Sequence, residues 1–217
     1  MIEEAGIVKK IFALIFAMIL VSSMAWADDT LPAPEKSGGP SLLQALSDRQ
    51  SAREFADTDL TPQQLSNLLW ATAGVNRSDG RRVYPVAVGI QDIFVDVLNR
   101  EGVYKYDPLK NALTLVEKGD HRMDTTTGQG FVGKAAVNLA YVHDASLWEG
   151  RKAPKEVIQQ WGFAHTGAAM QNAYLYAASQ GWNAVVRASF DQAKLSKLLK
   201  LTEGQAVTLV QSIGPKP

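Results

Sequence analysis

Apolar residues are arranged along this chain in two different patterns, and each pattern predicts one kind of element. A spacing of three to four residues predicts helices over residues 41–46, 61–71, 154–180 and 191–199. Short runs of apolar and β-branched residues predict strands over residues 93–98, 103–106, 112–116, 136–142, 184–186 and 207–210. Because strands fill the middle of the chain and helices flank them, the pattern predicts an α+β sandwich.

The boundaries of these elements carry their own signals. Thr61 can cap a helix, Pro62 suits its first turn, and Gly74 stops it. A turn-rich link over 107–111 joins two strand patterns and is typical of a hairpin. The run 136–142 is mostly apolar and rich in β-prone residues, which predicts a central strand.

The first 27 residues have the pattern of a targeting segment. Lys9 and Lys10 precede an apolar run over 11–21, and Ala25-Trp26-Ala27 has the form of a cleavage site. We therefore predict a signal peptide over 1–27, a flexible leader rich in Pro and Gly over 28–40, and a single domain over 41–217. Export to the periplasm follows from this interpretation, with a retained N-terminal anchor as the alternative.

Composition excludes several classes of function. Lys and Arg number 22, and so do Asp and Glu. A neutral chain without a basic stripe argues against nucleic acid as a partner. The absence of cysteine excludes disulfides, thiolate catalysis and cysteine-ligated metal. The three histidines are far apart, so we predict no metal site, and we interpret His165 as a buried or interfacial residue.

One short run has the composition of an anion site. Arg49, Ser51 and Arg53 follow the first helix pattern within five residues. Guanidinium groups, a hydroxyl and backbone N–H groups near a helix end suit a phosphate. The alternative is an ordinary solvated helix end. A second basic pair, Arg81-Arg82, is interpreted as a solvated loop.

Several segments together resemble the FMN-dependent nitroreductase family, from about residue 41 to the C-terminus. They are the run 49–55, the helix 65–76, the segment 181–187 and, most specifically, the helix carrying Gly167, Gln171 and Asn172. The hairpin 102–108 and the run 131–135 are similar to the branch containing thiazole/oxazole-forming (SagB-type) dehydrogenases. We interpret the two helix amides as interface or backbone-bridging groups, since a buried amide needs a partner.

The resemblance implies a nitroreductase-like sandwich, with a mostly antiparallel sheet between helices, and a homodimer with FMN in each of two shared pockets. The residues matching the family's FMN ligands are Arg49, Gln50, Ser51, Arg53, Pro85, Val86, Ala87, Gln91, Val185, Val186, Arg187, Ala188 and Lys216. The segment 85–91 would reach the flavin of the partner chain. The segment 185–188 would cover one flavin face and offer N–H groups near N5.

This chain departs from the family at several of these positions. Val86, Ala87 and Gly89 stand where polar side chains are common, so backbone groups or Gln91 would have to serve. Arg187 replaces an acidic residue. A cation there would favour a negatively charged substrate or the reduced flavin, unless it pairs with a surface carboxylate. Beyond the last strand, Lys216 alone could supply a basic phosphate ligand.

The sequence therefore predicts an exported FMN-dependent oxidoreductase that transfers a hydride through flavin N5 to or from a small organic substrate. The flavin carries this chemistry, so no catalytic side chain is expected. The electron donor is open between NAD(P)H and a carrier found outside the cytoplasm. The alternative from another class is a non-catalytic protein of the same fold that binds flavin or an aromatic ligand.

Overall fold

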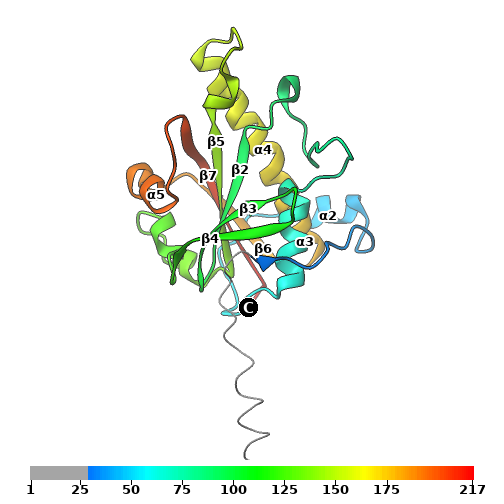
Figure 1. The fold of residues 1–217 in the computed structure, drawn as a ribbon. Helices are drawn as coiled ribbons and strands as arrows, with labels where there is room; N and C mark the ends of the chain where they lie inside the picture. Colours follow the sequence, from blue (N-terminus) through cyan, green and yellow to red (C-terminus); the bar gives the residue numbers. More distant parts are fainter. Residues whose placement is uncertain (1–28) are drawn as a thin grey trace, which may run out of the picture.

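A computed structural model describes residues 29–217; the predicted signal peptide lies outside the described residues. Its centre is one antiparallel sheet of seven strands in the order β1-β4-β3-β2-β5-β7-β6 (Figure 1). The strands are β1 (Asp29–Thr30), β2 (Ile93–Leu98), β3 (Gly102–Asp107), β4 (Ala112–Lys118), β5 (Val137–Asp144), β6 (Asn183–Arg187) and β7 (Gln205–Gly214). The α+β fold expected from the sequence is confirmed.

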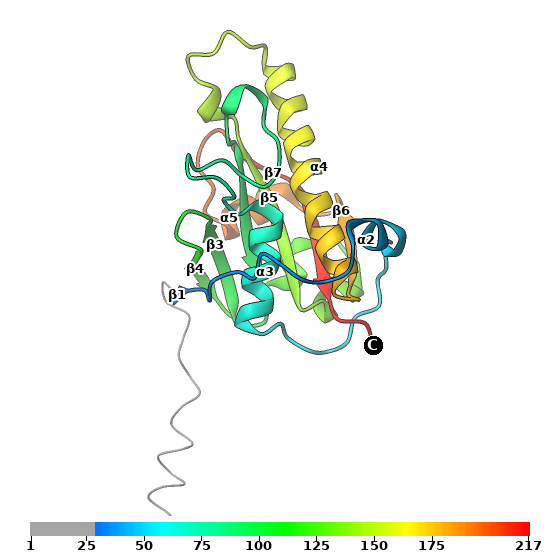
Figure 2. The same cartoon turned by 90° about the vertical axis from the view of Figure 1, so that its right-hand side faces the viewer.

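Helices cover both faces of this sheet. They are α2 (Leu42–Asp48), α3 (Pro62–Ala73), α4 (Lys155–Ser179) and α5 (Gln192–Leu198). Short 3-10 turns are η1 (Ala87–Gly89), η2 (Arg122–Thr125), η3 (Gly130–Lys134) and η4 (Ala145–Trp148). Figure 2 shows α3 and α4 side by side over one face, with α2 on the outer side of α4. On the other face, Leu195 and Leu199 from the α5 region pack against Ala140 and Val210.

Capping residues begin and end these helices at the positions that the sequence predicts. Ser41 caps α2, and Thr61 with Gln64 forms a capping box on α3, which Gly74 ends. Asp191 caps α5 in the same way. Strand β5 is buried along its whole length between β2 and β7, which confirms the central strand.

The first part of the predicted leader makes contacts with the sheet and with α3. Leu31 is 3% exposed and belongs to the main core, while its N–H donates to the Asn111 carbonyl. Ser66 Oγ donates to the Pro32 carbonyl, and Asn67 accepts from the Glu35 N–H. Residues 29–35 are therefore bound along β4 and α3. A Pro-rich composition marks irregular backbone, but it does not exclude tertiary anchoring.

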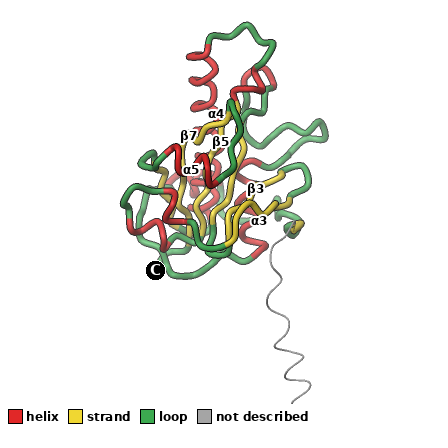
Figure 3. The backbone as a smooth tube through the Cα atoms, turned by 60° about the vertical axis from the view of Figure 1, so that its left-hand side comes forward, coloured by secondary structure: helices red, strands yellow, loops and turns green. Residues whose placement is uncertain are grey.

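One end of the molecule extends beyond the sheet. The segment from η4 to the first turns of α4 projects there, as the tube in Figure 3 shows. Within residues 29–217, no helix is both long enough and apolar enough to span a membrane.

Candidate functional site

The run Arg49–Arg53 follows α2 and lies along the edge strand β6. The N–H of Ala52 donates to the Ala184 carbonyl over 3.0 Å. Asn183 Nδ2 donates to the Glu54 carbonyl over 2.6 Å, and the buried Phe55 packs against Val185. The backbone of this run is therefore fixed beside the first residues of β6.

Tyr174 of α4 joins the two segments. Its hydroxyl lies 2.9 Å from Ser51 Oγ and accepts the N–H of Val186 over 2.7 Å. The Arg49 guanidinium carbon lies 5.6 Å from the centre of the Tyr174 ring, which is a cation–π distance. One N–H that the sequence assigned to the flavin, that of Val186, is thus engaged within the chain. Sequence reasoning missed Tyr174, although it sits in the helix motif that carries the resemblance.

Arg49 and Arg53 are the unpaired charges of this site. Within the described part of the chain, neither guanidinium forms a hydrogen bond or an ion pair, and Arg53 is exposed. Gln50 and Ser51 are exposed beside them. Two free guanidinium groups next to a hydroxyl are the donor set that a phosphate group requires, so these residues fit the phosphate end of FMN.

The C-terminal tail passes beside the same run. The N–H of Ala56 donates to the Pro215 carbonyl over 2.9 Å, and the Lys216 side chain is exposed. This places Lys216 near the continuation of the Arg49–Arg53 segment, where a third basic group could act.

The predicted orientation of Arg187 is wrong, because its side chain points into the protein. It is 5% exposed and donates to the carbonyl and hydroxyl of Thr125, to Asn138 Oδ1 and to Ser212 Oγ. Burial lowers the pKa of Arg187 to about 10. Both predictions for the Arg187 side chain are therefore wrong: it neither faces a substrate nor pairs with a surface carboxylate. Only the backbone of Arg187 could contact a ligand at the end of β6. Ala188, which follows, is exposed.

The segment Pro85–Gln91 is positioned by a different group of residues. The N–H of Ala87 donates to His165 Nε2 over 2.8 Å, so Nε2 carries no proton and Nδ1 can donate. His165 Nδ1 lies 2.7 Å from Asp92 Oδ1. This confirms His165 as a buried histidine and shows its role, which is to position the turn through Ala87.

Asp92 anchors this arrangement. It is fully buried, accepts from Trp148 Nε1 over 2.8 Å, and has His143 Nε2 at 3.3 Å. Burial acts to raise the pKa of Asp92, but the contacts with His143, His165 and Trp148 outweigh burial and hold it well below its ordinary value. No sequence spacing signals this cluster, since its members come from four separate segments.

The turn itself is strained and exposed. Val88 has φ 45° and ψ 25°, a left-handed conformation that is rare for a β-branched residue, and its side chain is 69% exposed. Such strain persists only where the surrounding structure enforces it, and it clusters at functional sites. Pro85, Val86 and Gly89 border a cavity beside this turn.

Gln91 and Arg82 hold the base of the turn. Arg82 Nε donates to Gln91 Oε1, and Arg82 Nη1 donates to the Ala73 carbonyl over 3.3 Å. Gln91 is therefore engaged within its own chain rather than free for a flavin. Arg82 is only 9% exposed, which corrects its interpretation as part of a solvated loop.

The two groups of candidate residues contact different parts of α4. His165 holds the turn, and Tyr174 holds the Arg49–Arg53 run nine residues later, about 14 Å along a helix. Asn172 Nδ2 reaches the Val83 carbonyl at 3.4 Å, in agreement with a backbone-bridging role. Within residues 29–217, no hydrogen bond joins the run directly to the turn.

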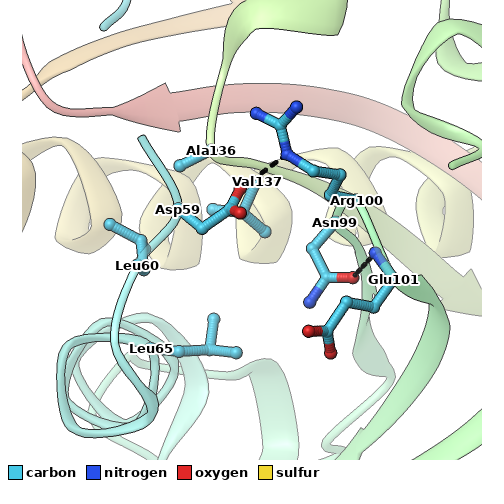
Figure 4. A pocket seen from close by; sticks show the side chains of 8 residues that line it. All are labelled: Asp59, Leu60, Leu65, Asn99, Arg100, Glu101, Ala136 and Val137. Atoms are coloured by element: carbon cyan, nitrogen blue, oxygen red, sulfur yellow. Dashed lines mark hydrogen bonds and ion pairs between the residues drawn. The ribbon is translucent and has the colours of Figure 1, made fainter. Parts of the chain in front are cut away.

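A smaller cavity lies at the turn between β2 and β3. Its volume is about 50 Å³, and the ion pair between Arg100 and Asp59 lies at its edge (Figure 4). Arg100 also binds Asp57, so it ties the segment after Arg53 to the sheet. This cavity is too small for a substrate and has a structural role. No group of three potential metal ligands occurs within residues 29–217.

Comparison with known proteins agrees with this architecture. A provisional nitroreductase from Ralstonia eutropha JMP134 is 37% identical, with a TM-score of 0.83 over 90% of this chain and 92% of that one. A provisional nitroreductase of Methanocaldococcus jannaschii is 29% identical over 75% of this chain and 85% of its own length. An NADPH:FMN oxidoreductase from Vibrio harveyi, 18% identical, shares the fold with a TM-score of 0.61 over 81% of this chain and 68% of that one.

The match to a family model covers most of the described chain. Residues 46–215 match the model of the nitroreductase family, a span that includes the Arg49–Arg53 run, the strained turn and the end of β6. The chain belongs to the nitroreductase family.

Proposed function

We propose that this protein is an FMN-dependent oxidoreductase that transfers a hydride to or from a small organic substrate. The observation that carries the proposal is the pair of unpaired guanidinium groups, Arg49 and Arg53, on a run fixed beside β6. Family membership supports an oxidoreductase, and one structural neighbour is named as an FMN oxidoreductase.

The chain's own residues would bind and orient the cofactor. FMN, when bound, supplies hydride chemistry at N5. Arg49 and Arg53 would neutralise its phosphate, and Ser51, held by Tyr174, would add a hydroxyl. The backbone at Val185–Ala188 would border the flavin ring. None of these side chains needs to act as an acid or a base.

A homodimer is part of this proposal. The Arg49–Arg53 run and the strained turn contact different turns of α4, so the turn that completes the site would come from a second copy of the chain. Large apolar side chains stand exposed on helices near both groups: Leu42, Leu43 and Leu46 on α2, and Trp161 and Phe163 on α4. A second copy that covers these side chains would also bring its turn to the first copy's site.

The compartment and the branch remain parts of the same proposal. The N-terminal signal pattern supports export, and the hairpin 102–108 supports the thiazole/oxazole-forming branch. Outside the cytoplasm NAD(P)H is not expected, so the donor would be another carrier, or the enzyme would oxidise its substrate and pass the electrons on.

The visible absorbance spectrum of the purified protein, before and after addition of FMN, tests the cofactor directly. We expect a bound-flavin spectrum and release of FMN on denaturation. Arg49→Ala and Arg53→Ala should each lose FMN while the circular dichroism spectrum is kept. Arg151→Ala is the matched control, since Arg151 is exposed and far along the chain from the site. Stoichiometric flavin in both site variants would contradict the assignment.

One observation favours a second candidate, a flavin or aromatic-ligand binding protein without turnover. Val86, Ala87 and Gly89 offer no polar side chains at the turn, and Gln91 is engaged by Arg82. Stopped-flow reduction with dithionite, followed by reoxidation with quinone, nitroaromatic and redox-protein acceptors, separates the two. An enzyme reoxidises rapidly with one acceptor class, whereas a binding protein shields its flavin from all of them.

A further inference from the structure

Three arginine side chains surround a cavity at the base of the strained turn. The cavity measures about 310 Å³ and is lined by Arg77, Arg81 and Arg82 together with residues of the segment 84–89. We refer to it as the arginine cavity. Among residues 29–217, no Asp or Glu lines it. Its size suits a small organic anion.

The guanidinium groups retain unused donors. Arg77 donates through Nε to Asn76 and through Nη2 to the Arg82 carbonyl. Arg82 uses Nε and Nη1. Since a guanidinium has five N–H donors, both groups keep terminal hydrogens with no partner among residues 29–217.

Charge compensation within the chain is incomplete. Arg81 Nε lies 3.4 Å from Asp79 Oδ2, but both side chains are at least half exposed, so this pair is weak. Arg82 is nearly buried and, among residues 29–217, donates to no carboxylate; it donates to the amide oxygen of Gln91 and to the carbonyl of Ala73. A buried cation is costly without a charged partner, and a bound anion would offset that cost.

A purely structural role explains only part of this arrangement. Arg82 holds Ala73 and Gln91 together, and Arg77 holds the Arg82 backbone. The Arg81 side chain pairs only with Asp79 and holds no comparable segment in place, yet Arg81 also lines the cavity. The adjoining residues include Val86 and Gly89, on either side of the strained Val88.

We propose that the arginine cavity binds the anionic group, a carboxylate or a phosphate, of the substrate. The assignment of that anion to a substrate rests on the proposed function; the anion site itself rests on Arg77, Arg81 and Arg82. The preference for a negatively charged substrate that the sequence placed at Arg187 would thus arise from the turn instead.

Isothermal titration calorimetry with inorganic phosphate and with benzoate tests the anion site. The protein is first saturated with FMN, or carries Arg49→Ala and Arg53→Ala if it does not bind FMN, so that the run 49–53 does not contribute. We expect millimolar or tighter binding of at least one probe. The affinity should fall at least tenfold in an Arg77→Ala/Arg81→Ala variant and remain unchanged in Arg151→Ala. The tighter probe identifies carboxylate or phosphate as the recognised group.

Circular dichroism and the melting temperature of the double variant verify its fold; Arg82 is left intact because it holds the turn. If that variant does not fold, Arg81→Ala alone replaces it, since Arg81 is exposed. Absence of binding by both probes, or equal binding by wild type and variant, would overturn the anion site.

The substrate role has a separate readout. In FMN-loaded protein, kcat/KM for 4-nitrobenzoate relative to neutral 4-nitrobenzamide should fall at least fivefold in Arg81→Ala, through KM. An unchanged ratio would overturn the substrate role. Lack of FMN binding would remove the proposed function and this role together, while the titration would still decide the anion site.

Discussion

Asp96 illustrates how one buried charge sets a pH dependence. It lies in the middle of β2, is 3% exposed, and its Oδ2 has no hydrogen-bond partner among the described residues. Burial raises the pKa of Asp96 to about 7, although Lys105 on the paired strand acts to lower it. The folded state therefore holds a proton that the unfolded chain releases.

The sign of the effect follows from this difference. Between the ordinary pKa of 3.8 and the folded value of about 7, the folded state binds more protons, so stability falls as pH rises. Each unit of difference corresponds to about 1.4 kcal/mol. We expect urea unfolding between pH 5 and pH 8 to show this decline in the wild type and a much flatter profile in Asp96→Asn. Parallel profiles would contradict the raised pKa.

Arg187 makes a second prediction at the scale of one residue. Lysine at this position keeps the charge but cannot reach Thr125, Asn138 and Ser212 together. Arg187→Lys should therefore lower the free energy of unfolding by about 1–3 kcal/mol, the cost of unsatisfied buried polar groups. The control is Arg53→Lys, which changes an exposed, unpaired side chain and should leave the urea midpoint unchanged. Equal midpoints for all three proteins would show that the buried bonds contribute little.

At the scale of elements, replacing Leu31 tests whether residues 29–35 are bound to the rest of the protein. Leu31→Ala should destabilise the protein by about 2–4 kcal/mol, because a 3% exposed leucine leaves a cavity in the main core. Leu109→Ala, at a side chain that is 72% exposed, is the matched control. Equal urea midpoints for the two variants would show that Leu31 contributes little to stability and would support a flexible leader.

The contact between α4 and the strained turn makes a prediction about local dynamics. His165→Ala removes the acceptor of the Ala87 N–H, so hydrogen exchange at Ala87 should accelerate at least tenfold. Trp148→Phe is the control, because it removes one hydrogen bond to Asp92 and leaves the His165 contact in place. Equal acceleration in both variants would mean that the cluster acts through general stability rather than through Ala87.

At the scale of the whole molecule, the proposed dimer and the proposed cofactor should be coupled. Leu43, 77% exposed on α2, is a candidate interface residue. We expect sedimentation velocity to give twice the mass of one chain and Leu43→Glu to shift the protein toward monomer with weaker FMN binding. Leu109→Glu changes an equally exposed leucine in the β3–β4 turn and should alter neither. A wild-type monomer that binds FMN fully would contradict the shared pocket.

Agreement between sequence and structure was closest where the signal is local. The bounds of β2 were predicted to the residue, and α3 begins and ends at the cap and glycine named for it. The role of the Arg49–Arg53 run in binding a cofactor stays a prediction, although its backbone is fixed beside β6. Less was predictable at the turn after Tyr84, because its anchors, Asp92, His165 and Trp148, are distant in the chain and lack a common motif.

The sequence by itself determined the four helices, the strands β2 to β7, the fold class and the family, because capping, apolar patterning and motif spacing are short-range properties of the chain. Only the tertiary structure decided which charged side chains are buried and which residues they contact. Arg187 turns inward to neutral acceptors, and Arg82 is buried beside two further arginines. The direction and burial of a side chain depend on which segments fold against it, so a charge expected at the flavin face lies in the core, and an expected surface loop borders a cavity.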